Sequence, residues 1–399
     1  MNLNFALANL YWFIPLPNST PRSKNMDERK ALLLSLLTLN SDLNSSDFVK
    51  KCIILGVKLN RRRILKITNF VNIIEHWEDD TFLETFRLSR TAVERLLEVI
   101  GTSLKINEHG RPATAAEIKV LISLKYMATQ ASFKEVSILF GVGSSVCCRS
   151  FKQFCMAVVA NRRQFFSFPR TAAEFFKNEH DFGFPGAVGA IDGCHIRVSP
   201  PRQERENYFN HKWFHSINFQ AVCNANKEIL VVFCKFPGRV GLHDARVLIN
   251  SDLYEAITKG DITFPERFHL LGDSAYPQCS WILTPFKDNG TLSVRQKRYN
   301  FQHSSKRMVI EHTFGNLKAR FRRLTSSLRN IAFVPVIVVT ACALQNLCVK
   351  YNSQEFHEEY VDADDSDDEF EDITHAMDVQ DLFVASADKR PLVMDILNV

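Results

Sequence analysis

The sequence lacks the motifs that mark several enzyme classes. None of its ten cysteines forms a C-x-x-C pair, and there is no H-E-x-x-H motif, so the common zinc-site patterns are missing. There is also no G-x-x-x-x-G-K-[ST] phosphate loop and no G-x-S-x-G nucleophile elbow. An NTPase or a serine hydrolase therefore loses its usual support. The scattered cysteines favour a reducing compartment.

Long apolar runs are also scarce. The longest, residues 331–344, contains Pro335 and is shorter than the ~20 residues that a membrane-spanning helix needs. The apolar patch at residues 10–16 has no charged segment before it and is interrupted by Pro15 and Pro17, unlike a signal peptide. We therefore expect a soluble, intracellular protein that has no membrane partner.

Acidic residues are sparse in most of the chain and crowded near its end. Residues 1–350 contain 47 Lys and Arg against 29 Asp and Glu, whereas residues 351–399 contain 2 against 15. The modest net charge of +5 therefore combines a strongly basic body with a strongly acidic tail. Such a body predicts a polyanionic partner, for which the tail could compete.

The hydrophobic pattern divides the chain into five parts. We predict an irregular leader over residues 1–26, a helical region over 27–160, a linker over 161–185, an α/β domain over 186–350 and a disordered acidic tail over 351–399. Within the helical region, the basic run at Arg61–Arg63 is either a weak nuclear import signal or the solvated face of a helix.

A helix-turn-helix pattern lies in the second half of the helical region. Ser132-Phe-Lys-Glu135 spells a capping box, which predicts a helix that begins there and runs to Phe140. Gly141 then supplies a turn, and a second helix is predicted to carry Arg149 and Lys152 on its outer face. The pair is either a DNA-binding unit or a structural helical module.

From residue 186 onward the pattern changes to strands with later helices. Strands are predicted at residues 187–191, 216–223, 229–236 and 268–271, with the second and third forming a hairpin. Helices are predicted at residues 247–257 and 306–324. Strands followed by alternating helix and strand indicate an α/β fold.

Three carboxylates lie where these elements leave the core. Asp192 and Asp273 each follow an apolar strand, and Glu311 lies at the edge of the apolar stripe of the long helix. Taken singly, each aspartate could simply start a turn or cap a helix. Together, the three predict an oxygen-rich pocket that suits Mg²⁺ or Mn²⁺ and the two-metal displacement of phosphodiesters. Asp244 is either a fourth ligand or an N-terminal helix cap.

Cations accompany Glu311 along the same helix face. Arg307, Lys318 and Arg322 lie at i−4, i+7 and i+11 from the glutamate, where they could hold phosphates or simply form a solvated face. His195 follows Asp192 by three residues and either assists the site or is a hydrogen-bonded core histidine.

Five sequence blocks stand out: GAIDGCHI at 189–196, YFNHKWFHSIN at 208–218, FPGR at 236–239 with HDARV at 243–247, LLGDSAYP at 270–277 and VIEHTFGNLK at 309–318. These blocks closely resemble the PIF/Harbinger transposases and the Harbinger transposase-derived nucleases. The resemblance implies an RNase H-like nuclease domain, a mixed sheet flanked by helices, after a helical, helix-turn-helix-like domain. It also implies a DDE site of Asp192, Asp273 and Glu311 that uses divalent metal, with Asp244 as a further metal ligand.

The resemblance extends to function and partners. It implies a metal-dependent DNA endonuclease that works in the nucleus beside a Myb-like DNA-binding protein, and it leaves a cytoplasmic pool and a homo-oligomer open. The alternative is a domesticated DNA-binding or partner-recruiting protein with little or no nuclease activity. Two residues depart from the family pattern: Cys194 stands where Thr is usual, and Trp213 stands where Gly or a smaller residue is frequent.

Overall fold

The computed structural model describes residue 67 and residues 70–104, 114–238, 244–352 and 388–397. The predicted leader, the basic run at Arg61–Arg63 and the acidic stretch at 355–372 lie outside these ranges.

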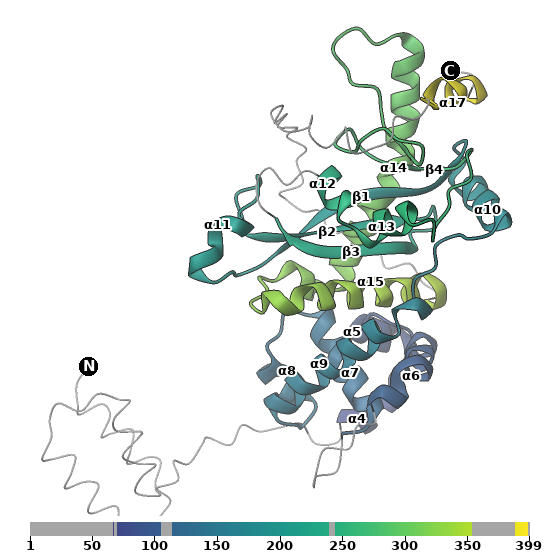
Figure 1. The fold of residues 1–399 in the computed structure, drawn as a ribbon. Coiled ribbons are helices and arrows are strands. Elements are labelled where there is room, and N and C mark those ends of the chain that lie inside the picture. The colour runs from purple at the N-terminus through teal and green to yellow at the C-terminus, as the bar shows by residue number, and fades with distance from the viewer. Residues whose placement is uncertain (1–66, 68–69, 105–113, 239–243, 353–387, 398–399) are drawn as a thin grey trace, which may run out of the picture. The chain divides into compact units, whose positions relative to one another are not determined.

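Six helices form the described part of the N-terminal region (Figure 1). Their shared core includes Phe86, Ile122 and Phe154, none of which is exposed to solvent. The helices are α4 (Phe70–Glu75), α5 (Asp79–Phe86), α6 (Arg90–Leu104), α7 (Ala116–Ala128), α8 (Phe133–Leu139) and α9 (Ser144–Ala160).

The predicted helix-turn-helix layout is present in α8 and α9. Ser132 accepts a hydrogen bond from the Glu135 N–H, and the Glu135 carboxylate accepts one from the Ser132 N–H, so the predicted capping box starts α8. Gly141 has φ +67°, a conformation that favours glycine. A Cβ at this position would lie 2.7 Å from the Ile67 carbonyl oxygen, which gives a second reason for glycine.

A five-stranded mixed sheet forms the core of the second part, in the order β3-β2-β1-β4-β5. β1 pairs antiparallel with β2, which pairs antiparallel with β3, while β1–β4 and β4–β5 are parallel. This mixed sheet, flanked by helices and preceded by a helical region, confirms the expected fold class. The strands are β1 (Ala187–Arg197), β2 (Ser216–Cys223), β3 (Ile229–Pro237), β4 (His269–Leu271) and β5 (Ile282–Leu283).

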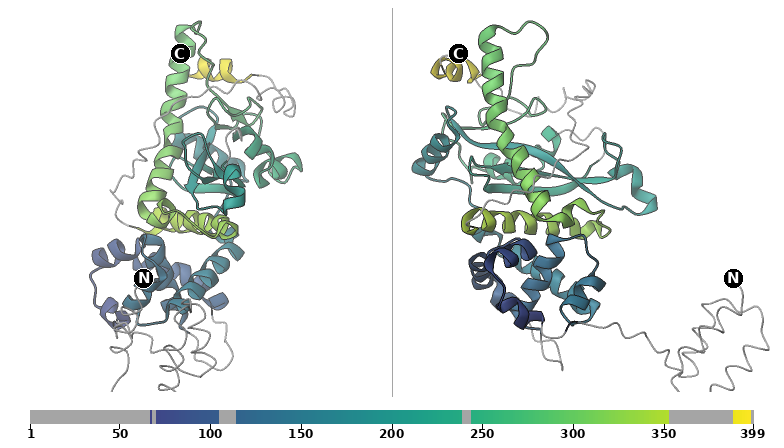
Figure 2. Two further views of the ribbon diagram at one scale, coloured as in Figure 1. Left: turned by 90° about the vertical axis from the view of Figure 1, so that its left-hand side faces the viewer. Right: turned by 180° about the vertical axis from the view of Figure 1, so that it is seen from behind.

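Helices cover both faces of the sheet (Figure 2). One face packs against α14 (Val294–Arg320) and α15 (Val334–Tyr351), and the Phe219 and Phe314 rings, 5.2 Å apart, join β2 to α14. The other packs against α10 (Ala172–Phe182), α12 (Asp244–Ile249) and α13 (Asp252–Thr258). The short elements are η1 (Arg162–Gln164), η2 (Arg202–Glu204), α11 (Arg205–Tyr208), η3 (Arg322–Thr325) and η4 (Ile331–Phe333).

Several expected boundaries are wrong. The helix predicted at 306–324 is α14, which begins at Val294 and ends at Arg320, so Arg322 lies in η3 and not on the helix face of Glu311. Residues 161–185, predicted to be a linker, contain α10, which begins with a capping box between Thr171 and Glu174 and buries Phe175 against the sheet. The helix predicted at 247–257 is two helices, because the Ser251 hydroxyl accepts a hydrogen bond from the Tyr254 N–H and starts a new one.

Both faces of β2 are buried, although its alternating pattern predicts one polar, exposed face. The polar side chains of that face have partners inside the domain: Gln220 Nε2, for example, donates to the Tyr276 hydroxyl at 2.7 Å. The helices α12 and α13 cover this side, which the local alternation could not indicate.

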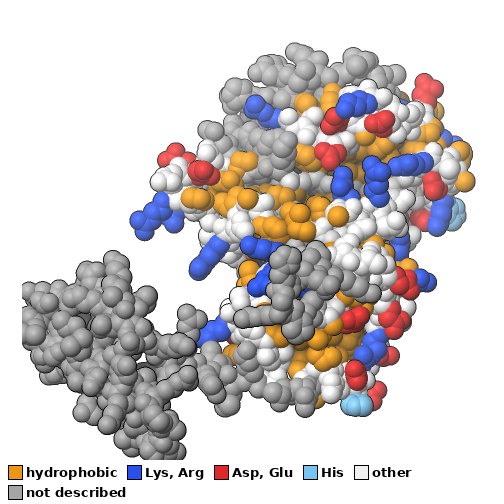
Figure 3. Space-filling model, turned by 60° about the horizontal axis from the view of Figure 1, so that its bottom comes forward, with side chains coloured by type: hydrophobic (Ala, Val, Ile, Leu, Met, Phe, Trp, Pro, Cys, Tyr) orange, Lys and Arg blue, Asp and Glu red, His pale blue; other side chains and the backbone are white. Residues whose placement is uncertain are grey.

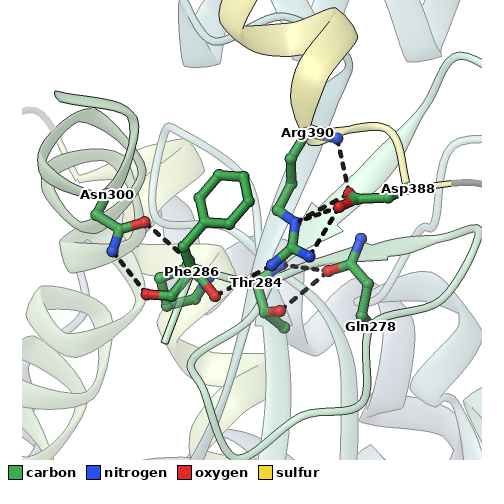
Figure 4. A network of polar contacts seen from close by, with 7 residues as sticks. Gln278, Thr284, Phe286, Asn300, Asp388 and Arg390 are labelled. Atoms are coloured by element: carbon green, nitrogen blue, oxygen red, sulfur yellow. Dashed lines mark hydrogen bonds and ion pairs between the residues drawn. The ribbon is translucent and has the colours of Figure 1, made fainter. Parts of the chain in front are cut away.

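The end of the chain is not uniformly a disordered tail. Helix α17 (Arg390–Ile396) buries Val393 in the main core. Arg390 pairs with Asp388 at 2.8 Å and lies over the Phe286 ring at 4.1 Å, while Asn300 holds the backbone of Phe286 (Figure 4). The tail prediction therefore fails for residues 388–397.

One helix in the described ranges, at residues 331–351, is long and apolar enough to cross a membrane. Two thirds of its apolar window is buried inside the structure, where α15 packs against α9 and β3. Its hydropathy therefore has a structural explanation as a core helix.

Candidate active site

Asp192 lies inside the longest strand of the sheet. The sequence predicted that this strand ends at Asp192, but β1 continues to Arg197 because Cys194 and Ile196 extend the apolar alternation into the core. Asp192 is paired with Ala221 of β2. Its Oδ1 accepts a hydrogen bond from the Gly193 N–H at 2.8 Å, which leaves Oδ2 to face the long helix.

The sheet register brings Asp273 beside Asp192. Ala190 of β1 is paired with Leu271 of β4 in parallel, and each aspartate lies two residues beyond its member of that pair. Side chains two residues apart on a strand share a face, and neighbouring strands lie about 4.8 Å apart. A turn fixes Asp273, whose Oδ1 accepts a hydrogen bond from the Ala275 N–H at 3.0 Å.

Helix α14 supplies Glu311 and the cation that joins the carboxylates. Arg307 Nη1 donates to Asp192 Oδ2 at 2.8 Å, and Arg307 Nη2 donates to Glu311 Oε1 at 2.5 Å. The glutamate is one helical turn after the arginine, so both reach the same side of α14. Buried Ile310 and Phe314 pack the helix against the sheet and set this orientation.

Arg307 is the electrostatic centre of the site. Its own burial opposes the charged form, but the charges of Asp192, Glu311 and Asp273 outweigh burial and raise the pKa of Arg307. The side chains of Arg307 and Asp192 are only 19% and 15% exposed, whereas Glu311 is 42% exposed. Two of the three predicted carboxylates, Asp192 and Glu311, therefore contact one guanidinium, and the charge of Asp273 acts on the same group.

The donor set fits a hard divalent cation in its chemistry. Carboxylate oxygens are the ligands that Mg²⁺ and Mn²⁺ prefer, and two of the three carboxylates already share one cationic partner. In the conformation of the described residues, no group of three acidic, His or Cys side chains is close enough to hold a metal ion. Asp244 begins α12, but its side chain is outside the described part of the chain.

His195 belongs to a buried polar network instead of the carboxylate group. Its Nδ1 is 2.9 Å from the Ser216 hydroxyl, which also accepts a hydrogen bond from Asn210 Nδ2 at 3.0 Å. Burial, together with the charges of His211, Lys212 and Lys318, lowers the pKa of His195 to about 3, so its ring is neutral near pH 7. Of the two readings of the sequence, the structure supports the hydrogen-bonded histidine.

The other two cations predicted beside Glu311, Lys318 and Arg322, differ in their exposure to solvent. Lys318 is 8% exposed, whereas Arg322 is exposed and lines a cavity of about 230 Å³ with Arg87 and Lys125. Burial and the charge of Arg87 lower the pKa of Lys125. No sequence pattern connects Arg87 and Lys125 with Arg322, because the three meet only in the folded chain.

On α9, the predicted DNA contacts Arg149 and Lys152 are exposed, as a DNA contact requires.

Comparison with protein families matches residues 191–346 to the DDE superfamily endonucleases. The matched part of the chain is therefore similar to this endonuclease family. The match includes Asp192, Asp273 and Glu311, together with the helix α14 that carries Arg307. The resemblance seen in the five sequence blocks is therefore confirmed for this domain.

Curated relatives of the DDE domain include transposase-derived proteins. HARBI1 of Rattus norvegicus, named as a candidate nuclease, is 28% identical over 281 residues, which cover 68% of this chain and 78% of the relative. The antagonist of like heterochromatin protein 1 of Arabidopsis thaliana is 25% identical, over 68% of this chain and 74% of the relative. A probable transposase of insertion sequence IS702 from Microchaete diplosiphon is 23% identical over 55% of this chain and 75% of the relative. No solved structure gives a significant match.

Proposed function

We propose that this protein is a divalent-metal-dependent endonuclease that hydrolyses DNA phosphodiesters at Asp192, Asp273 and Glu311. The observation that carries the proposal is that the Arg307 guanidinium contacts Asp192 and Glu311 and is influenced by the charge of Asp273. Carboxylates at such range repel one another, so the arrangement requires a cation. The endonuclease family to which residues 191–346 are similar hydrolyses phosphodiesters, and a divalent cation held by these carboxylates would serve that reaction.

The residues have distinct proposed roles. Asp192 on β1, Asp273 in the turn after β4 and Glu311 on α14 would hold Mg²⁺ or Mn²⁺, with Asp244 as a fourth ligand. When bound, the metal would activate water and stabilise the leaving oxygen during in-line displacement at phosphorus. The rigid sheet fixes the two aspartates relative to each other, whereas the more exposed Glu311 can adjust to the substrate.

DNA is the proposed substrate and partner. Lys and Arg side chains form a scattered band across the middle of the face in Figure 3, with Asp and Glu side chains above and below it. Arg149, Lys152, Arg307, Lys318 and Arg322 are the proposed DNA-binding cations; because Lys318 is buried, its role would be indirect. A nuclear location and a Myb-like DNA-binding partner are further parts of the proposal, taken from the family resemblance.

A second candidate function is a DNA-binding or partner-recruiting protein without nuclease activity. In favour of it, Arg307 engages two carboxylates, and the described residues include no three-ligand group in this conformation. One relative is named as an antagonist of a heterochromatin protein, which is a non-catalytic description. Loss of a carboxylate would have favoured this function, but all four are present.

Nicking of supercoiled plasmid DNA tests the nuclease proposal. The purified full-length protein should nick DNA in Mg²⁺ or Mn²⁺ and not in a chelator, and Asp192→Asn should lose at least 100-fold in rate, on the order of a lost catalytic electrostatic contact. Asp79→Asn, which changes an exposed carboxylate of α5, is the control and should retain full activity. Equal nicking by wild type and Asp192→Asn would refute the assigned site.

A further inference from the structure

The loop between α11 and β2 presents a tryptophan to solvent. The Trp213 side chain is 83% exposed, more than any other large hydrophobic side chain in the described ranges. An indole in water loses the stabilisation that burial of a large ring normally provides. An exposed Trp at the tip of a loop therefore calls for an explanation outside the core.

The backbone at Trp213 is strained as well. Its φ is +63°, in the left-handed region where a residue with a Cβ costs roughly 1–2 kcal/mol. The family to which the sequence is similar often has Gly here, and glycine would adopt this conformation without strain. This chain therefore combines an unfavourable backbone with an unfavourable exposure at one residue, a combination found at functional sites.

Buried hydrogen bonds hold the loop in this conformation. The Trp213 N–H donates to the Asn210 carbonyl at 3.2 Å, and the Phe214 N–H donates to Asn210 Oδ1 at 3.1 Å. Asn210 is only 1% exposed, and its Nδ2 donates to the Ser216 hydroxyl, which is bonded to His195 of β1. The indole is thus presented by a turn that is fixed to β1, the strand that carries Asp192.

The surroundings of the indole favour a polyanion over an apolar partner. Lys212 precedes Trp213, Arg202 and Arg205 are exposed in the same segment, and Arg197 packs over the Phe214 ring at 3.9 Å. Two acids, Glu204 and Glu206, leave an excess of positive charge in residues 197–215. An exposed aromatic ring among cations is the arrangement by which proteins bind single-stranded nucleic acid.

The sheet sets the spacing between this loop and the carboxylates. Ser216, where the loop enters β2, is paired with Arg197, five residues after Asp192 on β1. At about 3.3 Å per strand residue, the loop begins about 16 Å from Asp192. This span corresponds to about five nucleotides of a DNA strand at 3.4 Å each.

We propose that Trp213 stacks on an unpaired base of a DNA strand whose backbone reaches the carboxylate site, several nucleotides away. The proposal rests on the proposed function in one respect, that the site binds DNA. It assigns to this loop a stacking contact for single-stranded or locally opened DNA. The cations of the loop would hold the neighbouring phosphates.

Tryptophan fluorescence tests the contact directly. Among the described tryptophans, Trp77 is half-buried and Trp281 is 7% exposed, so stacking should quench mainly the emission of Trp213. A single-stranded oligonucleotide should quench the wild-type protein, and Trp213→Phe should remove most of that quenching. A fully paired duplex should quench less than the single strand. No quenching by either DNA would overturn the proposal.

The variant Trp213→Gly separates a binding role from a structural one. It should lower affinity for the single strand about tenfold, as expected for one lost base stack. Because glycine tolerates the positive φ, its unfolding midpoint should stay equal or rise. As a control, Arg205→Ala should weaken binding in a salt-dependent way and leave the quenching amplitude intact. Wild-type affinity in Trp213→Gly would overturn the proposal and favour a protein partner for this loop.

The plasmid assay distinguishes this proposal from the nuclease proposal. Quenching that depends on Trp213 in a protein that does not nick DNA would support stacking and refute the nuclease. Nicking without such quenching would support the nuclease and overturn the role of Trp213.

Discussion

Replacing Arg307 by methionine should destabilise the protein through the carboxylates that it holds. The bond to Asp192 joins two side chains that are less than one fifth exposed, so its loss should cost about 2 kcal/mol, as for a hydrogen bond between charged groups. The bond to Glu311 is more exposed and should contribute less than about 1 kcal/mol. We therefore expect Arg307→Met to lower the unfolding midpoint by about 5 °C.

A divalent cation should reverse this loss. Arg307 and a metal ion would use the same carboxylate oxygens, so removal of the guanidinium frees Asp192 and Glu311 for the metal. Added Mn²⁺ should therefore raise the unfolding midpoint of Arg307→Met more than that of the wild type. Calorimetric titration should show about tenfold tighter Mn²⁺ binding by the variant.

Arg295→Met is the matched control for this experiment. Arg295 is on the same helix and pairs with Asp395 at 2.6 Å, but both side chains are more than half exposed. Its loss should cost less than about 1 kcal/mol and leave Mn²⁺ binding unchanged. If Arg307→Met matched this control in both stability and Mn²⁺ response, Arg307 would not be the counter-ion of the carboxylates.

Three further predictions concern stability. Burial lowers the pKa of His195 and His269 to about 3 and of His303 to about 4. Below pH 6.5 the unfolded chain therefore binds more protons than the folded chain does. At pH 5 each histidine should reduce the unfolding free energy by about 2 kcal/mol relative to pH 7. Identical urea midpoints at pH 7 and pH 5 would contradict this. Gly238→Ala should cost about 2 kcal/mol, because its Cβ would lie 2.0 Å from the Ser216 hydroxyl; Gly101→Ala, with open space, should instead stabilise α6. Arg390→Ala should release α17 to proteolysis, whereas Leu392→Ala, at an exposed position, should not; equal resistance of the two would exclude Arg390 as the anchor of α17.

Local sequence patterns predicted most of the elements that carry the site. The alternation at 216–223 and the apolar runs at 229–236 and 268–271 gave β2, β3 and β4 within about one residue. The capping box at Ser132 gave the start of α8. The sequence could predict that Asp192, Asp273 and Glu311 belong to one site because each borders an apolar segment that was recognised as a strand or helix.

Tertiary contacts decided the remaining features. The pairing of Ala190 with Leu271 places the two aspartates side by side, and no local signal reveals that register. The spacing of Arg307 predicts its helix face, but it does not show that Asp192 lies on the strand opposite that face. α10 was missed although Thr171 and Glu174 spell a capping box and the buried Phe175 and Phe182 are seven residues apart, a helical spacing.

The comparison of Glu311→Gln with wild type in metal-dependent DNA cleavage tests the central claim most directly. Glu311 shares the Arg307 guanidinium of α14 with Asp192 of β1. The account predicts that Glu311→Gln loses Mg²⁺-dependent nicking while it keeps its fold, and that His312→Gln, its exposed neighbour, cleaves like the wild type. Equal cleavage by Glu311→Gln and the wild type would contradict the account.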